Sequence, residues 1–146
     1  MDKVTYKYKQ LTAALRTLGK ALAVFKDLET RGRPFNPQVD YVDEYRIYRD
    51  SIIQRFEYTI DLFWKYLKTY LETAQVPLTL KTPSEIIRSS FSSGIISEDE
   101  AQQILEMLKS RNTTLHVYVE EVAEQLAHII PGCYALLGKI IQRLKK

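Results

Sequence analysis

The chain has 146 residues, of which 45% are hydrophobic and 27% charged, with a formal net charge of +3 at pH 7. This composition suits one globular domain and argues against an obligate nucleic-acid binder, because basic and acidic residues alternate along most of the sequence. The single cysteine, Cys133, excludes an internal disulfide, and no apolar run is long enough for a signal peptide or a membrane span, so we expect a cytoplasmic protein.

Glycine and proline number only five each, which favours long helices. The first helix is predicted from about residue 4 to residue 29, followed by a breaker-rich loop at residues 31–37. A longer helix is predicted over residues 40–73, and its charged side is expected to be solvated. The apolar positions follow helical spacing in both: Leu11, Leu15, Leu18, Leu22 and Phe25 in the first, and Ile53, Phe56, Ile60, Phe63, Leu67, Tyr70 and Leu71 in the second. The charged side of the second helix carries Asp50, Arg55, Glu57, Asp61, Lys65 and Lys68.

The second half of the chain predicts shorter elements. Residues 82–85 and 97–100 both resemble capping boxes, which begin a short helix ending near Gly94 and a further helix running toward Arg111. Weak helix formers predict a local break or loosening near residues 112–118. A last helix from about Val119 is expected to be kinked or interrupted at Pro131, and its basic end at residues 143–146 to be solvated. The chain is therefore predicted to be all-α: one antiparallel up-and-down bundle of four to five helices over residues 1–146.

Several enzyme classes lack their residues in this sequence. No glycine-rich phosphate loop and no strand pattern is present, and one cysteine with two histidines is too few for a zinc site. We expect no metal and no cofactor, and we interpret His128 as a residue on a helix surface.

One arginine lies where an apolar residue is expected. Helical spacing predicts a single apolar stripe along residues 104–129, in which an arginine and a tyrosine take two positions: Ile104, Leu108, Arg111, Leu115, Tyr118, Val122, Leu126 and Ile129.

Two interpretations of this arginine remain open. Arg111 pairs with a carboxylate such as Glu57 or Asp61 at an edge of the bundle, or it clamps a phosphate beside His116, which takes a proton from a ribose 2′-hydroxyl. Arg111 and His116 are five positions apart, so they reach one site only if the helix loosens or a second copy of the chain contributes.

The stretch RNTTLHVY, residues 111–118, resembles the Arg-Asn-x3-His-x-Tyr signature of the HEPN superfamily. More specifically, it is similar to the nucleotidyltransferase substrate-binding proteins, the helical partners of minimal nucleotidyltransferases. The stretches RDSIIQRFEYTIDLFWKYLKTYLE, TPSEIIRSSFSSGIISEDE and LEMLKSRNTTLHVYVEE follow that family's pattern in order. The resemblance runs from Asp50 to Leu144, with a family-like region from about residue 40. The first forty residues are longer than the family leads us to expect.

The resemblance implies a homodimer formed through the motif, and assembly with a separately encoded minimal nucleotidyltransferase, plausibly as a heterotetramer. It implies that a nucleotide or RNA binds in the dimer cleft, with Arg111 on the phosphate and Asn112 orienting. Glu57, Trp64 and Lys65 would form a substrate groove.

The alternative that the resemblance implies is a metal-independent endoribonuclease toxin. In that case His116 acts as general acid or base with Arg111, and the nucleotidyltransferase is the antitoxin that adenylylates Tyr118.

Overall fold

The computed structural model describes the backbone of residues 1–116 and 119–144 and the side chains of residues 1–110 and 119–144. Within these ranges the chain forms helices and no strand: α1 (Lys3–Arg31), α2 (Tyr41–Thr73), α3 (Pro83–Ser92), α4 (Glu98–His116) and α5 (Glu120–Leu144). The all-α prediction is confirmed.

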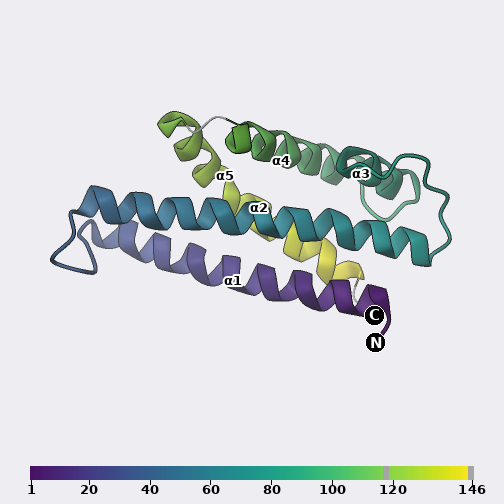
Figure 1. Cartoon of the computed structure of the whole chain (residues 1–146), viewed down its shortest axis with the longest axis horizontal. Coiled ribbons are helices and arrows are strands. Elements are labelled where there is room, and N and C mark those ends of the chain that lie inside the picture. Colours follow the sequence, from purple (N-terminus) through teal and green to yellow (C-terminus); the bar gives the residue numbers. More distant parts are fainter. Residues whose placement is uncertain (117–118, 145–146) are drawn as a thin grey trace.

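The four long helices run up and down in chain order (Figure 1). α1 and α2 form a long antiparallel pair, α4 runs back beside α2, and α5 returns to the end of the bundle where α1 begins. The short α3 lies next to the start of α4. The predicted bundle architecture is therefore confirmed, whereas dimerisation stays a prediction.

A single hydrophobic cluster joins the helices. The predicted stripes of α1 and α2 are buried in it, apart from Leu22 and Tyr70, which are half-buried. α3 adds Ile86 and Ile87, and α4 adds Ile104 and Leu108. None of the helices in the described part of the chain combines the length with the apolar character that a membrane span requires.

The loop between α1 and α2 is folded onto the first turn of α2. α1 ends at Gly32, whose φ of 65° is the left-handed conformation that glycine adopts without strain. The carboxylate of Glu44, only 6% exposed, accepts hydrogen bonds from the backbone N–H of Phe35 (2.6 Å) and of Asn36 (3.3 Å). The guanidinium of Arg31 lies 4.8 Å from the centre of the Phe35 ring. These contacts bind the loop of residues 31–37 to the end of α1 and to the first turn of α2.

The capping predictions hold at the start of α3 and of α4. Thr82 accepts from the N–H of Glu85 at 3.4 Å, and Ser97 and Glu100 cap each other reciprocally at 2.9 and 3.1 Å. The Glu100 carboxylate also accepts hydrogen bonds from both Nη atoms of Arg143 on α5, at 2.9 and 2.8 Å. Arg143 is nevertheless exposed, as expected of a solvated helix end, and residues 145–146 lie outside the described part of the chain.

The helix break expected near residues 112–118 is confirmed, because α4 ends at His116 and α5 begins at Glu120. The interruption expected at Pro131 was wrong. α5 continues through Pro131 without interruption. Because the chain leaves one helix at His116 and enters another at Glu120, no single stripe spans residues 104–129. Ile129, predicted to face the core, is accordingly 44% exposed.

Candidate functional site

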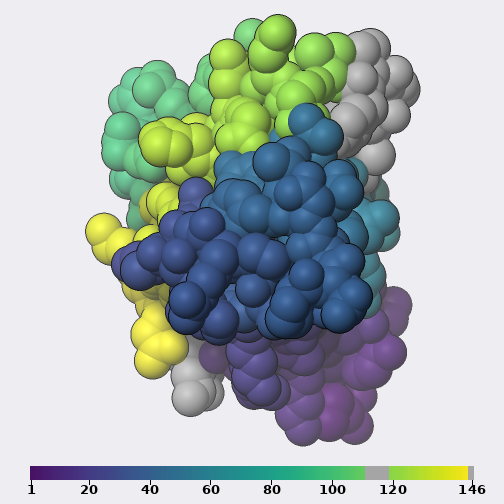
Figure 2. All heavy atoms as spheres, turned by 90° about the vertical axis from the view of Figure 1, so that its left-hand side faces the viewer, coloured from purple at the N-terminus to yellow at the C-terminus, as the bar shows by residue number. Residues whose placement is uncertain are grey.

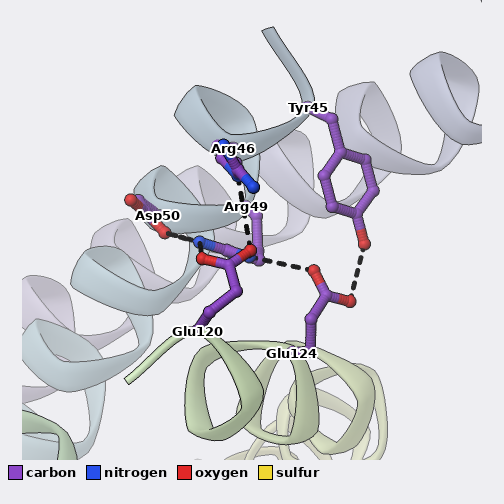
Figure 3. A network of polar contacts seen from close by, with 6 residues as sticks. All are labelled: Tyr45, Arg46, Arg49, Asp50, Glu120 and Glu124. Carbon is purple, nitrogen blue, oxygen red and sulfur yellow. Dashed lines mark hydrogen bonds and ion pairs between the residues drawn. The ribbon is translucent and has the colours of Figure 1, made fainter. Parts of the chain in front are cut away.

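A buried cation joins α2 to the start of α5 (Figure 3). Arg49 lies on the apolar stripe of α2, one turn before Ile53, and its side chain is 0% exposed. Its Nε donates to Asp50 Oδ1 at 3.1 Å and its Nη1 to Glu124 Oε1 at 3.0 Å. Both of its Nη atoms donate to the carboxylate of Glu120. A guanidinium buried in this way is stabilised only because carboxylates surround it.

Two further side chains of α2 extend this network. The Tyr45 hydroxyl donates to Glu124 Oε2 at 2.9 Å, and Arg46 Nε donates to Glu120 Oε1 at 3.4 Å. We call the six residues the Arg49 network: Tyr45, Arg46, Arg49, Asp50, Glu120 and Glu124.

Contacts within the network shift the pKa of Arg49, Glu120 and Tyr45. Hydrogen bonding to Glu120 is the largest influence that raises the pKa of Arg49. The same contact lowers the pKa of Glu120. Burial raises the pKa of the Tyr45 hydroxyl, and its hydrogen bond to Glu124 raises that pKa further. At neutral pH Arg49 and Glu120 are therefore charged, and the Tyr45 phenol is neutral.

The network fixes the first turns of α5. Glu120 is the first residue of α5 and Glu124 follows one turn later, so both anchors lie directly after residues 111–118. Figure 2 shows the beginning of α5 lying against the N-terminal part of α2. The chain is thus held firmly at the point where it leaves the Arg-Asn-x3-His-x-Tyr stretch.

The side chains of Arg111, Asn112, His116 and Tyr118 lie outside the described residues. Their convergence on a phosphate, and the pairing of Arg111 with Glu57 or Asp61, therefore stay predictions. The backbone does decide one point, because residues 111–116 are helical. Positions five apart on a regular helix point well over a right angle apart. If Arg111 and His116 act on one phosphate, a second copy of the chain has to contribute.

The other predicted binding residues lie on α2, where the structure brings two of them together. Trp64 Nε1 donates to Asp61 Oδ1 at 3.1 Å and Lys65 Nζ to Asp61 Oδ2 at 2.9 Å. Lys65 Nζ also lies 5.9 Å from the centre of the Trp64 ring. Glu57, one turn before Asp61, is half-buried like the other three. The charged residues expected on the solvated side of α2 are all at least partly exposed, and Arg55 is exposed.

These two groups of polar residues are separate. Arg49 and Lys65 are sixteen positions apart on α2, which corresponds to about 24 Å along a helix. Trp64 and Lys65 therefore do not belong to the Arg49 network.

Sequence reasoning missed Arg49, Tyr45, Glu120 and Glu124. The signal was present in part, since Arg49 and Tyr45 continue the stripe of α2 backward from Ile53 in steps of four. An arginine within an apolar stripe is the same feature that singled out Arg111.

No group of three or more His, Cys, Asp or Glu residues within the described ranges is arranged so that it could hold a metal ion. His128 is exposed on α5, as predicted.

The fold and these sites define a bundle of long helices whose polar side chains gather at helix junctions. The model of the family described as "Nucleotidyltransferase substrate binding protein like" matches residues 6–146, so the chain belongs to that family. The match includes α1, which the sequence resemblance starting at Asp50 did not reach. The chain is similar to a protein from Thermus thermophilus known from a crystal structure, with 32% identity and a TM-score of 0.65 over 88% of this chain and 99% of that one. No curated protein matches the chain.

Proposed function

We propose that this chain is the substrate-binding subunit of a two-component nucleotidyltransferase. It docks a separately encoded minimal nucleotidyltransferase in the cytoplasm and holds the phosphate of a nucleotide or nucleic acid in the cleft of a homodimer. The observation that carries the proposal is the family match over residues 6–146, because the family's name describes a partner of a nucleotidyltransferase.

The outer side of α2 is the best-supported docking surface for the enzyme. Trp64 and Lys65 are held in place by Asp61, so they lose little conformational freedom on binding. Tyr58 and Ile47 are 61% and 63% exposed, and aromatic and apolar side chains of this kind supply much of the energy of protein interfaces. Positions 47, 58 and 65 fall on one side of a regular helix, which makes this a continuous surface.

The phosphate site is proposed at residues 111–118 of two copies of the chain. Arg111 binds the phosphate, and Asn112 orients the ligand. The helical backbone through His116 supports a site that needs both copies, as argued above. The Arg49 network supports it further by anchoring the chain just beyond Tyr118.

Calorimetric titration of this protein with the nucleotidyltransferase encoded beside it tests the docking surface. Tyr58→Ala and Lys65→Glu are each expected to weaken binding by about tenfold or more, because they remove an aromatic anchor and reverse a charge. Lys20→Glu, an exposed lysine on α1, is the matched control and should leave the affinity unchanged. Equal affinities for all four proteins would overturn the assignment of this surface.

The complete Arg-Asn-x3-His-x-Tyr stretch favours a second candidate, a metal-independent endoribonuclease. In this case His116 is the general acid or base, and the partner silences the enzyme by transferring an adenylyl group from ATP to the Tyr118 hydroxyl, with release of pyrophosphate.

The purified protein should then cleave single-stranded RNA in the presence of a chelator. His116→Ala should abolish cleavage without changing the free energy of unfolding, whereas His128→Ala, at an exposed histidine of α5, should not. Cleavage that survives His116→Ala would exclude this mechanism.

A further inference from the structure

A cavity of about 540 Å³ lies between α1 and α5, with Tyr45 of α2 in its wall. It belongs to neither the motif segment nor the Trp64–Lys65 surface. Three aromatic side chains line it: Phe25, Tyr45 and Tyr134. The rings of Phe25 and Tyr45 are 5.1 Å apart, so they form one continuous aromatic wall. Its volume falls in the range of small-molecule sites.

The third aromatic residue, Tyr134, packs against a glycine in the middle of α1. A Cβ atom at Gly19 would lie 2.5 Å from the Tyr134 hydroxyl oxygen and 2.9 Å from the ring carbon that carries it. Glycine is unfavourable in a helix interior, yet here it is what allows the Tyr134 ring to lie directly against the backbone of α1. The position of Tyr134, and with it the shape of the cavity, therefore rests on Gly19.

Two carboxylates are among the polar groups that line the cavity. Glu29 comes from α1 and Glu124 from α5. Both carboxylates raise the pKa of the Tyr45 hydroxyl, after the larger effect of burial, so both lie near one point of the wall. Pro131 has no N–H to donate to the carbonyl of Ala127 one turn earlier, and both residues line the cavity.

The two glutamates that line the cavity differ in their ion pairs. Glu124 is already neutralised by Arg49, whereas Glu29 forms no ion pair with any described residue. Lys26 is the one lysine or arginine among the lining residues, and it is exposed. A ligand that enters the cavity therefore meets two carboxylates, of which the exposed Glu29 has no ion-pair partner among the described residues.

We propose that this cavity binds a small organic cation with a flat aromatic body. The ring lies between Tyr134 and the wall formed by Phe25 and Tyr45, and the cationic nitrogen donates to Glu29 and Glu124. Aromatic faces attract cations, and hydrogen bonds between a cation and a carboxylate are about twice as strong as neutral ones. Binding at this site requires no nucleotidyltransferase, so it is independent of the proposed function.

Three probes of similar size distinguish a cation site from a site for neutral or anionic ligands. Benzamidine is a cation, benzamide is its neutral counterpart and benzoate is an anion. Calorimetry or ligand-observed NMR with the full-length protein should show benzamidine binding at least about tenfold more tightly than benzamide, with benzoate weaker still. A site that selects neutral heteroaromatic rings would prefer benzamide, and a site that relies on Lys26 and His128 would prefer benzoate. Either preference would overturn the proposal, as would the absence of benzamidine binding up to about 10 mM.

Variants then place the probe in this cavity. Glu29→Gln should weaken benzamidine binding about tenfold and leave benzamide unaffected; because Glu29 is exposed, the fold should be unchanged. Gly19→Ala should displace Tyr134 and remove binding. Gly138→Ala on α5, where an added Cβ meets nothing within 4 Å, is the matched control and should bind normally. Benzamidine binding that is equal in the Glu29→Gln variant and the unchanged protein would contradict the site.

Discussion

The guanidinium of Arg49 on α2 lies 3.0 Å from the carboxylate of Glu124 on α5, and no part of the arginine side chain is exposed. These residues are 75 positions apart in the sequence. The contact holds the first turns of the last helix, which follows residues 111–118 in the sequence. A structural ion pair in this position links the packing of the bundle to the proposed phosphate site.

Removing the carboxylates of the network should cost more than removing its cation. The double substitution Glu120→Gln and Glu124→Gln leaves a buried guanidinium without its partners from α5, and we expect a loss of about 3 kcal/mol in the free energy of unfolding. Arg49→Met fills the same space and leaves two carboxylates that are 47% and 45% exposed and remain hydrated, so we expect a smaller loss of about 1–2 kcal/mol. Urea denaturation of the variants measures both values.

Arg46→Met is the control for this comparison. Its pair with Glu120 is 3.4 Å long, with side chains 52% and 47% exposed, so its loss should stay below about 0.5 kcal/mol. A larger loss for Arg49→Met than for the double variant would show that desolvation of the guanidinium does not dominate.

Two helical glycines should respond to alanine in opposite directions. Alanine is about 1 kcal/mol more favourable than glycine in a helix interior, so Gly138→Ala, with open space around the new methyl group, should raise the free energy of unfolding by up to about that amount. Gly19→Ala forces the Tyr134 ring to move, and we expect a net loss of about 1–2 kcal/mol. Thermal unfolding of the two variants gives the comparison. Equal stabilisation by both would mean that Tyr134 moves away at no cost.

The contact between Glu100 and Arg143 should make the fold sensitive to acid. The Glu100 side chain is 9% exposed, and its hydrogen bonds to Arg143 are the main reason why its pKa is lowered to about 2 from an ordinary value of 4.5. A carboxyl group whose pKa is lower in the folded state stabilises it fully above the ordinary pKa and loses this effect as the pH falls toward the lowered one. The contribution at neutral pH is at most about 3 kcal/mol.

Urea denaturation at a series of pH values between about 5 and 2 tests this contribution. Glu100→Gln should lower the stability at pH 7 and make the decline over that range clearly shallower, while Glu120, whose pKa is also lowered, keeps contributing to it. Glu98→Gln, at an exposed carboxylate in the same turn, should keep the decline. An unchanged acid profile in the Glu100→Gln variant would contradict the assignment.

The helices were predictable from the sequence because few glycines and prolines interrupt it and because the apolar residues of α1 and α2 keep helical spacing over many turns. The break between α4 and α5 was predictable from the weak helix formers at residues 112–118, although Ile104 and Leu108 are in phase with Val122 and Leu126 across it. The helix interruption predicted at Pro131 was wrong. A proline removes one backbone hydrogen bond, but packing of the residues around it kept α5 continuous.

The candidate site was predictable only in part. Local spacing identifies an arginine on an apolar stripe but does not reveal its partners, which for Arg49 lie 71 and 75 positions away. Trp64 and Lys65 were recognised through family resemblance, whereas their common contact with Asp61 is a consequence of spacing by three and four residues on one helix.

The account depends most on this chain being the partner of a nucleotidyltransferase. Co-expression with the nucleotidyltransferase encoded beside it, followed by size-exclusion chromatography with light scattering, tests that claim directly. We predict one complex that contains two copies of this chain and has a molar mass consistent with bound enzyme. Separate elution of the two proteins at both low and high salt would contradict the claim.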